Sequence, residues 1–146
     1  MLALNAIQPS WPAPANVQAL QTIRQGGVSL APYANLNLAL HVNDDEACVR
    51  HNRQVLRTAL PSEPVWLNQV HGVTVLDAAL CQGVPDADAS FTRQANVVCV
   101  TMTADCLPVL LCDRAGTVVS VVHAGWRGLC DGAIDRKSTR LNSSHD

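Results

Sequence analysis

The sequence is poor in aromatic and in charged residues. Only 3% of its 146 residues are Phe, Trp or Tyr, and only 15% are charged. A core built from this chain must therefore consist mainly of Val, Leu, Ala and Ile. Hydrophobic residues make up 48% of the chain, which excludes a disordered protein and is enough for one domain with a core of its own.

The chain also lacks a basic surplus, a long apolar run and an export signal. Its formal net charge is −2, whereas a protein that binds nucleic acid needs clustered Lys and Arg. No apolar run is long enough to span a bilayer, and Gln8 and the prolines up to Pro14 interrupt any signal segment. We therefore expect a cytoplasmic protein with neither nucleic acid nor a membrane as partner.

No two of the six cysteines form a Cys-x-x-Cys pair. This absence argues against a zinc finger and against a thioredoxin-type site. Because the chain shows no export signal and has enough apolar residues for a core, a disulfide framework is not expected either.

The order of patterns predicts an α+β fold in mixed α/β layers, with a mixed β-sheet core and flanking helices. A helix is expected from a cap at Asn43 to Asp45 up to Pro61, because apolar residues recur there at helical spacing. A second helix is expected to begin near Leu129.

The strand predictions depend on short apolar runs between turn signals. Val65 to His71 alternates with period two, which predicts a strand that ends at His71. Gly72 is expected to turn the chain, and a further strand segment follows it. Asp77 to Asp88 is expected to be mostly loop. Further strands are predicted at 97–101, 109–112 and 118–122, with a hairpin connection over 113–116. These later runs are almost continuously apolar, so their strands are expected to be buried on both faces.

We expect residues 1–134 to be the N-terminal portion of a single domain, and residues 135–146 to be a non-native or disordered tail. After Ile134 the sequence becomes abruptly polar, at the point where a helix should be forming its apolar face. The run from Arg136 to His145 is similar to a translated cloning or sequencing adapter. The predicted fold is therefore incomplete.

Three side chains that can bind a metal lie at the ends of predicted strands or between them: His71, Cys106 and His123. Structural zinc sites usually pair their ligands at short spacing, and the gaps here are wide. Three ligands assembled by a finished fold, with a fourth position open, are typical of catalytic zinc. Each histidine can equally be an ordinary hydrogen-bonded or surface residue, so the residues alone leave both interpretations open.

Long runs around these three residues resemble the signature motifs of a known family. They are Trp66 to Gly72, Thr103 to Leu110 and His123 to Gly128. Similar motifs occur in the bacterial multicopper-polyphenol-oxidase-like family, whose members were once labelled laccases and are now regarded as purine nucleoside phosphorylases. The human laccase-domain-containing protein is related to them. The resemblance runs from about Trp11 to Ile134 and includes an N-terminal pattern at Arg24 to Ser29, Leu36 to Leu38 and Asn52-Arg53.

The resemblance implies an activity, a metal and its ligands. The metal is zinc, bound by His71, Cys106 and His123. The activity is phosphorolysis of adenosine, inosine and methylthioadenosine to the base and ribose 1-phosphate, with deamination of adenosine. The implied partners are thus a purine nucleoside and phosphate. Family members are longer, and nothing here matches the later Gly-Pro-rich segment that contributes to their fold and active-site wall.

Two further roles need residues of this chain. Deamination needs a carboxylate that carries a proton and does not itself bind the metal. Asp105 is the candidate because it adjoins Cys106. This requires a local turn, since adjacent side chains in an extended segment point apart; Asp105 can equally be a turn or capping residue. Phosphate needs a cationic site, for which Arg24 and Arg127 are candidates, and Asn37 is a third candidate for substrate or phosphate binding.

Three alternative functions remain. The first is a copper-dependent polyphenol oxidase, but a multicopper oxidase needs about ten histidines, usually in His-x-His pairs. This chain has five histidines and no such pair. The second is a metal-independent cysteine hydrolase that uses Cys106 and His123. The third is an inactive metal-binding fragment.

Overall fold

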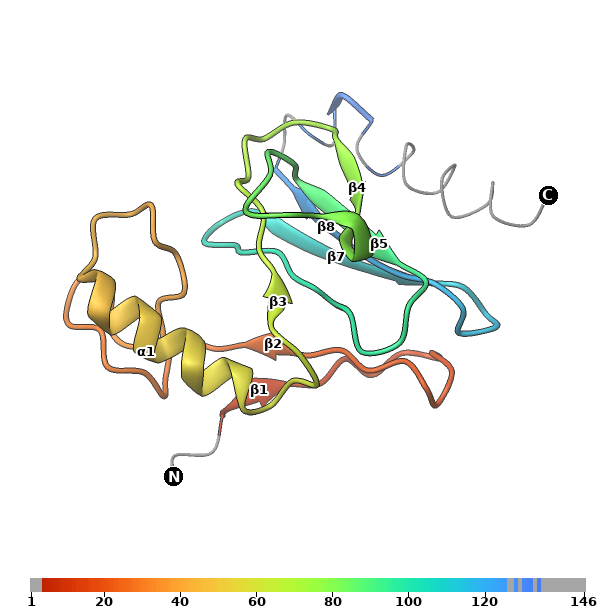
Figure 1. Cartoon of the computed structure of the whole chain (residues 1–146). Coiled ribbons are helices and arrows are strands. Elements are labelled where there is room, and N and C mark those ends of the chain that lie inside the picture. The colour runs from red at the N-terminus through yellow and green to blue at the C-terminus, as the bar shows by residue number, and fades with distance from the viewer. Residues whose placement is uncertain (1–3, 126–127, 129, 133, 135–146) are drawn as a thin grey trace. The chain divides into compact units, whose positions relative to one another are not determined.

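The computed structural model describes residues 4–125, 128, 130–132 and 134, and these fall into two compact units. The first unit comprises Met1–Pro12 and Gln18–Ser62, and the second comprises Ala13–Val17 and Glu63–Asp146 (Figure 1). No helix in the described part of the chain is long and apolar enough to cross a membrane. Leu129, where the second helix was predicted to begin, and the tail at 135–146 lie outside the described residues.

The first unit contains helix α1 (Glu46–Arg57) and a small antiparallel sheet of β1 (Ala6–Ile7) and β2 (Gln21–Thr22). The side chain of Asp45 caps α1 by accepting the first free backbone N–H groups, those of Ala47 and Cys48. The predicted helix and the place of its cap are therefore confirmed. The helix ends before the predicted stop at Pro61, because the backbone N–H groups of residues 59 and 60 bond three residues back and tighten the chain into a turn.

Asn52 joins α1 to the loop that precedes it. The residue is fully buried, and its Oδ1 accepts the backbone N–H of Val28. Its Nδ2 donates to Ser29 Oγ and to the carbonyl oxygens of Asn35 and Asn37. The amide of Asn52 thus satisfies polar groups from several turns of the loop, which a buried side chain must do to be stable.

The second unit is organised by a mixed four-stranded sheet in the order β4-β5-β8-β7 (Figure 1). Strand β4 (Val75–Asp77) runs parallel to β5 (Ala89–Thr92), and β8 (Val119–Ala124) runs antiparallel to both β5 and β7 (Leu107–Cys112). A short parallel pair is formed by β3 (Pro64–Val65) and β6 (Val98–Cys99), and the 3₁₀-helix η1 (Ala78–Leu80) follows β4. The predicted α+β class and mixed sheet are confirmed.

One prediction about strands is wrong, and one strand is missing from the predictions. The strand predicted from Val65 to His71 stops at Val65, and beyond it only Asn68 forms an isolated bridge, to Asp86. Trp66 and Leu67 are both buried, so the alternation in sequence is not an alternation in exposure. The segment predicted as loop is followed directly by β5, which the patterns missed because all four of its residues are buried and two of them are polar.

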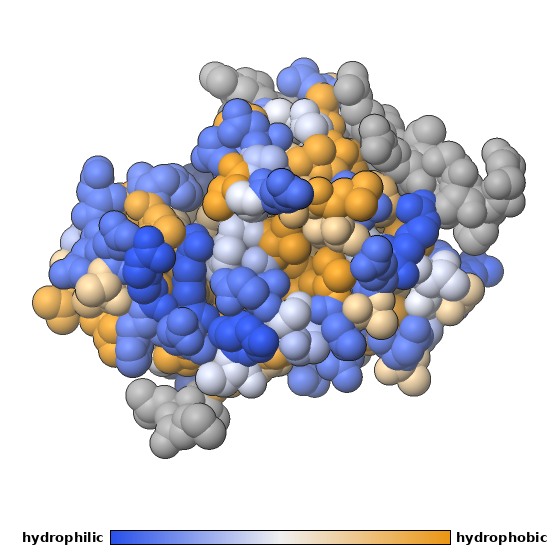
Figure 2. Space-filling view, in the orientation of Figure 1, coloured by the Kyte–Doolittle hydropathy of each residue, from blue (hydrophilic) through white to orange (hydrophobic). Residues whose placement is uncertain are grey.

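Burial in the sheet depends on the position of each strand. Strand β8 is central and almost entirely buried, as predicted, whereas the edge strand β7 is only half-buried. One face of the sheet carries the core, and Figure 2 shows hydrophobic residues gathered over this part of the molecule. Two clusters of buried hydrophobic side chains lie there: Val75, Ala89, Phe91 and Val118 form one, and Val122 and Ala124 form the other. Side chains alternate along a strand, so His123 projects from the face opposite to Val122 and Ala124.

Candidate metal centre

His71 lies in a tight turn between β3 and β4, and its backbone φ of 58° is in the left-handed region. This conformation is uncommon for a residue other than glycine. It is held by Asp88, whose carboxylate accepts the backbone N–H groups of Val70, His71 and Gly72 at 2.9, 3.0 and 2.9 Å. Three successive N–H groups therefore converge on one carboxylate, and the His71 side chain is left exposed.

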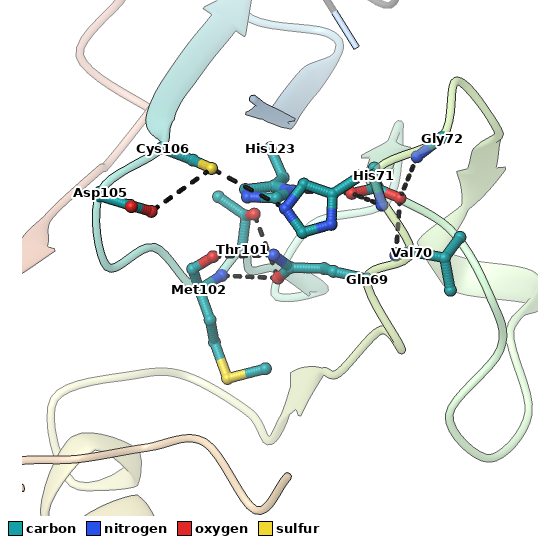
Figure 3. Close-up of polar contacts among 10 residues, drawn as sticks. Gln69, Val70, His71, Gly72, Thr101, Met102, Asp105, Cys106 and His123 are labelled. Atoms are coloured by element: carbon teal, nitrogen blue, oxygen red, sulfur yellow. Dashed lines mark hydrogen bonds and ion pairs between the residues drawn. The ribbon is translucent and has the colours of Figure 1, made fainter. Parts of the chain in front are cut away.

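Cys106 ends a bend over residues 104–106, immediately before β7. The side chain of Gln69 forms hydrogen bonds with the segment that precedes Cys106 (Figure 3). Gln69 Nε2 donates to the carbonyl oxygen of Met102, and Gln69 Oε1 accepts the backbone N–H of Met102, both at 2.7 Å. The side-chain amide thus takes the place of a strand partner and links the segment before His71 to the segment before Cys106.

His123 lies in β8 and is 5% exposed. Its Nδ1 is 2.7 Å from Asp88 Oδ2, and its backbone N–H donates to the Asp88 carbonyl oxygen at 2.8 Å. Its ring meets the ring of His71 edge to face, with the centroids 4.9 Å apart. Because Nδ1 is engaged by Asp88, Nε2 is the ring nitrogen left for a ligand.

The structure brings the three predicted ligands together (Figure 3). One ligand atom from each of His71, Cys106 and His123 lies within 4.8 Å of the others. Cys106 Sγ and His71 Nε2 are 3.9 Å apart, and the bond lengths of a tetrahedral zinc site would put them about 3.5 Å apart. In the described part of the chain, this is the one group of three such side chains that could hold a metal ion.

The space among His71, Cys106 and His123, which we call the cradle, is kept open by Gly125. A Cβ added at this residue would lie 3.2 Å from His71 Cδ2 and 3.3 Å from Cys106 Sγ. A side chain at this position would therefore fill the cradle between two of the ligands. The donor set, the spacing and the absence of a side chain at Gly125 all fit a single metal ion.

The charges around the cradle favour a cation. Burial by itself would raise the pKa of Asp88, but hydrogen bonds from His123 and from the backbone of Gly72, Val70 and His71 lower it below its ordinary value. The pKa of the Cys106 thiol is raised by burial, by the charge of Asp105 and its hydrogen bond, and by the charge of Asp88. Without a cation Cys106 is therefore a thiol, and a metal that binds it must displace a proton.

The other predicted site residues lie in different places. Asp105 is exposed, and its Oδ1 is 3.8 Å from Cys106 Sγ, since the bend directs both side chains the same way (Figure 3). Arg24 and Asn37 belong to the first unit. Arg24 donates to the carbonyl oxygens of Pro32 and Ala34, and Asn37 bonds to Asp44 and Ala39. Arg127 lies outside the described residues.

The sequence patterns did not identify Asp88, Gln69 or Gly125 as parts of this site. Asp88 lies in the stretch predicted to be mostly loop, and without β5, which follows it directly, the patterns give no reason to expect it beside His123. Gln69 was interpreted only as one position of an alternating strand. Gly125 lies inside the motif from His123 to Gly128, and its place two residues after a proposed ligand was a usable signal.

Comparison with known proteins identifies the family. The family model described as multi-copper polyphenol oxidoreductase laccase matches residues 18–146. The chain belongs to this family. Its curated members include a purine nucleoside phosphorylase of Pseudomonas aeruginosa, 53% identical over 129 residues, and the purine nucleoside phosphorylase YfiH of Escherichia coli, 52% identical over 135 residues. Each alignment covers 88% of this chain but 53% and 54% of those proteins, so the chain spans about half of their length.

Solved structures of similar proteins have the same fold. A Neisseria meningitidis protein superposes with a TM-score of 0.89 at 48% identity, over 94% of this chain and 57% of its own. YlmD of Geobacillus stearothermophilus superposes with a TM-score of 0.80 at 31% identity, over 88% and 52%. The family resemblance and fold class predicted from the motifs are thus confirmed.

Proposed function

We propose that the chain carries the metal-binding part of a zinc-dependent purine nucleoside phosphorylase. The reaction would convert adenosine, inosine or methylthioadenosine, with phosphate, to the base and ribose 1-phosphate, and the same centre would deaminate adenosine. The observation that carries this proposal is the convergence of His71, Cys106 and His123 in a chain about half identical to proteins named purine nucleoside phosphorylases. Residues 1–134 would be the N-terminal portion of the enzyme's domain.

Zinc suits the donor set better than copper. Thiolate and imidazole are both donors of catalytic zinc sites, which take three protein ligands and leave a fourth position open. A blue-copper centre takes the same three donors but adds a weak axial ligand such as Met, Gln or a backbone oxygen. The family description names a multicopper chemistry, which requires several copper sites. The described residues supply a single group of three ligands. Copper in this one site is the alternative, and metal analysis distinguishes the two ions.

Each residue of the centre would have a separate task. Zinc, when bound, supplies a Lewis acid and lowers the pKa of water at the open position. His71, Cys106 and His123 would hold the ion, and Gly125 would leave room beside them. Asp105 would hold and pass a proton through its carboxylate, because it adjoins Cys106 and its side chain is exposed to an incoming substrate.

The phosphate site is the less defined part of the proposal. A transferred phosphate needs cationic or hydrogen-bonding groups, and Arg24, Asn37 and Arg127 are the candidates. The Asn37 amide already donates to the Asp44 carboxylate, which would repel an anion. Asn37 therefore suits a nucleoside hydroxyl better than phosphate, and the two arginines are preferred for the anion.

Two alternatives are less well supported. A metal-independent cysteine hydrolase needs a thiol whose pKa is lowered, whereas the pKa of Cys106 is raised by its surroundings. An inactive metal-binding fragment would bind zinc without turnover. The six cysteines all lie within the described residues and form no disulfide there, and a cytoplasmic location would keep them reduced.

The test combines metal analysis with turnover of adenosine and inosine in the presence and absence of phosphate. We expect one zinc per purified chain and ribose 1-phosphate only when phosphate is supplied. His71→Ala should abolish both zinc binding and the formation of ribose 1-phosphate. His51→Ala, at an exposed position on α1, should change neither of them. The Escherichia coli relative, assayed alongside, controls for the assay. Free ribose as the sole sugar product would mean a hydrolase, and zinc without turnover would mean a binding fragment.

A further inference from the structure

Asp88 is the most deeply buried acidic residue near the cradle, and it is not one of the proposed ligands. It is 1% exposed and immediately precedes β5. Its carboxylate accepts four hydrogen bonds: Oδ1 from the backbone N–H groups of Val70 and Gly72, and Oδ2 from the backbone N–H of His71 and from His123 Nδ1. A carboxylate has about four lone-pair positions in all, so every acceptor position is occupied.

We propose that Asp88 is the positioning residue of the metal centre, which sets the orientation of two ligands at once. Toward His123, it fixes the ring so that Nδ1 carries the proton and Nε2 is free to bind a metal. Toward His71, it holds the left-handed turn from which that side chain projects. This inference depends on the proposed metal site but not on the nucleoside reaction.

The tautomer follows from the donors that surround Asp88. Three of its four partners are backbone N–H groups, which can only donate. A proton on Oδ1 would point at two donors, the N–H groups of Val70 and Gly72. Hydrogen bonds from three N–H groups stabilise the charged form of the carboxyl group, so the proton shared between Oδ2 and Nδ1 belongs to the imidazole and Asp88 is a carboxylate. A carboxylate can only accept, and His123 Nδ1 must therefore donate to it. Histidines that bind metals through one nitrogen commonly donate the other N–H to a carboxylate in this way.

The turn at His71 depends on the same carboxylate. Three successive N–H groups that face one anion form a concave backbone nest, which needs a left-handed residue such as His71. Without an acceptor these partly buried N–H groups would each lose a partner, and the turn would open toward an ordinary extended segment. The direction of the His71 side chain would change with it.

Asp88→Asn is the decisive variant, because an amide of the same shape must turn its NH₂ group toward one pair of these donors. If the NH₂ group replaces Oδ2, His123 must move its proton to Nε2, and the nitrogen needed for the metal is blocked. If it replaces Oδ1, the N–H groups of Val70 and Gly72 lose their acceptor. Both arrangements weaken the site, by about ten- to hundredfold in zinc affinity, the range seen when such supporting groups are removed.

The experiment measures zinc affinity by competition with a chromogenic chelator, and the tautomer of His123 by ¹⁵N NMR of the metal-free chain. Asp86→Asn is the matched control, with the same change of charge two residues away at an exposed site. We expect the loss of affinity in Asp88→Asn alone, and the Nδ1–H tautomer in the wild-type chain. Unchanged affinity in a folded Asp88→Asn chain, or an Nε2–H tautomer in the wild type, would overturn the proposal.

These readouts separate the inference from the proposed function. The tautomer is measured on the wild-type chain, so the inference stays testable even if Asp88→Asn does not fold. If the wild-type chain binds no zinc but His123 is the Nδ1–H tautomer, the metal centre is refuted while the contact between Asp88 and His123 stands. A loss of thermal stability in Asp88→Asn without a loss of zinc affinity would assign Asp88 a purely structural role and overturn the inference.

Discussion

The cradle at Gly125 allows the metal site to be tested by adding a single methyl group. In Gly125→Ala the new Cβ would lie 3.2 Å from His71 Cδ2 and 3.3 Å from Cys106 Sγ. Carbon atoms in contact normally lie about 3.5–4.0 Å apart, so the His71 ring alone must move by at least about 0.3 Å. Zinc sites keep their ligand distances within about 0.2 Å, and the two crowded neighbours are both proposed ligands.

The substitution should weaken metal binding rather than destabilise the fold. Gly125 does not have a positive φ, so alanine can adopt its backbone conformation. His71 is exposed, and in the metal-free chain its ring can turn away from the methyl group at little cost. Once zinc must be bound, that freedom is lost. We expect zinc affinity to fall about ten- to hundredfold, which is about 1.4–2.8 kcal/mol.

Gly72→Ala is the matched control, because it adds the same methyl group beside the same histidine. Its Cβ would lie 3.7 Å from Val70 Cγ2 and 3.8 Å from Asp88 Oδ1, both ordinary contacts, and the N–H that Asp88 accepts is retained. Zinc affinity is measured by chelator competition, and folding by thermal melting of the metal-free chains. Equal zinc affinity in the two folded variants would refute the argument that Gly125 makes room for the ion.

Two predictions concern side-chain amides. Gln69→Ala should remove both hydrogen bonds to Met102 and lower the stability of the fold by about 1–3 kcal/mol, with weaker zinc binding because Cys106 follows that segment. Chemical denaturation and chelator competition test this, with Gln82→Ala at an exposed site as control, and zinc affinity equal to that of the control would contradict it. Asn52→Ala should lower the free energy of unfolding by about 3 kcal/mol, since one buried and three partly buried hydrogen bonds to the loop before α1 are lost. Gln54→Ala, on the exposed side of α1, should have little effect in the same denaturation experiment, and equal stabilities would refute the role of Asn52.

The features that the sequence predicted correctly are those that depend on neighbouring residues. Helix α1 follows from a capping aspartate and helical spacing, which act within a few residues. The hairpin of β7 and β8 follows from two apolar runs around a turn. Strand β5 was missed because its pairing with β4 and β8, not its own pattern, makes it a strand. Polar residues such as Ser90 are buried there by their partners in the sheet.

The candidate ligands were identified by their motifs, whereas the residue that positions them was not. The reason is that the role of Asp88 consists of contacts with residues 70–72 and with His123, which the fold alone brings to it. No periodicity near Asp88 could indicate those partners. A buried acidic residue is costly unless it is paired, so its burial would have been the strongest signal had it been visible in the sequence.

The wrong strand prediction at His71 has a physical cause that is tied to the site. In a strand, successive backbone N–H groups point in opposite directions, so they cannot all reach one carboxylate. The N–H groups of Val70, His71 and Gly72 do reach Asp88, and therefore the chain must leave the extended conformation at His71. The local pattern favours a strand up to His71, and the left-handed φ there opposes it. Such a conflict between local preference and structure is expected where a site imposes its own geometry.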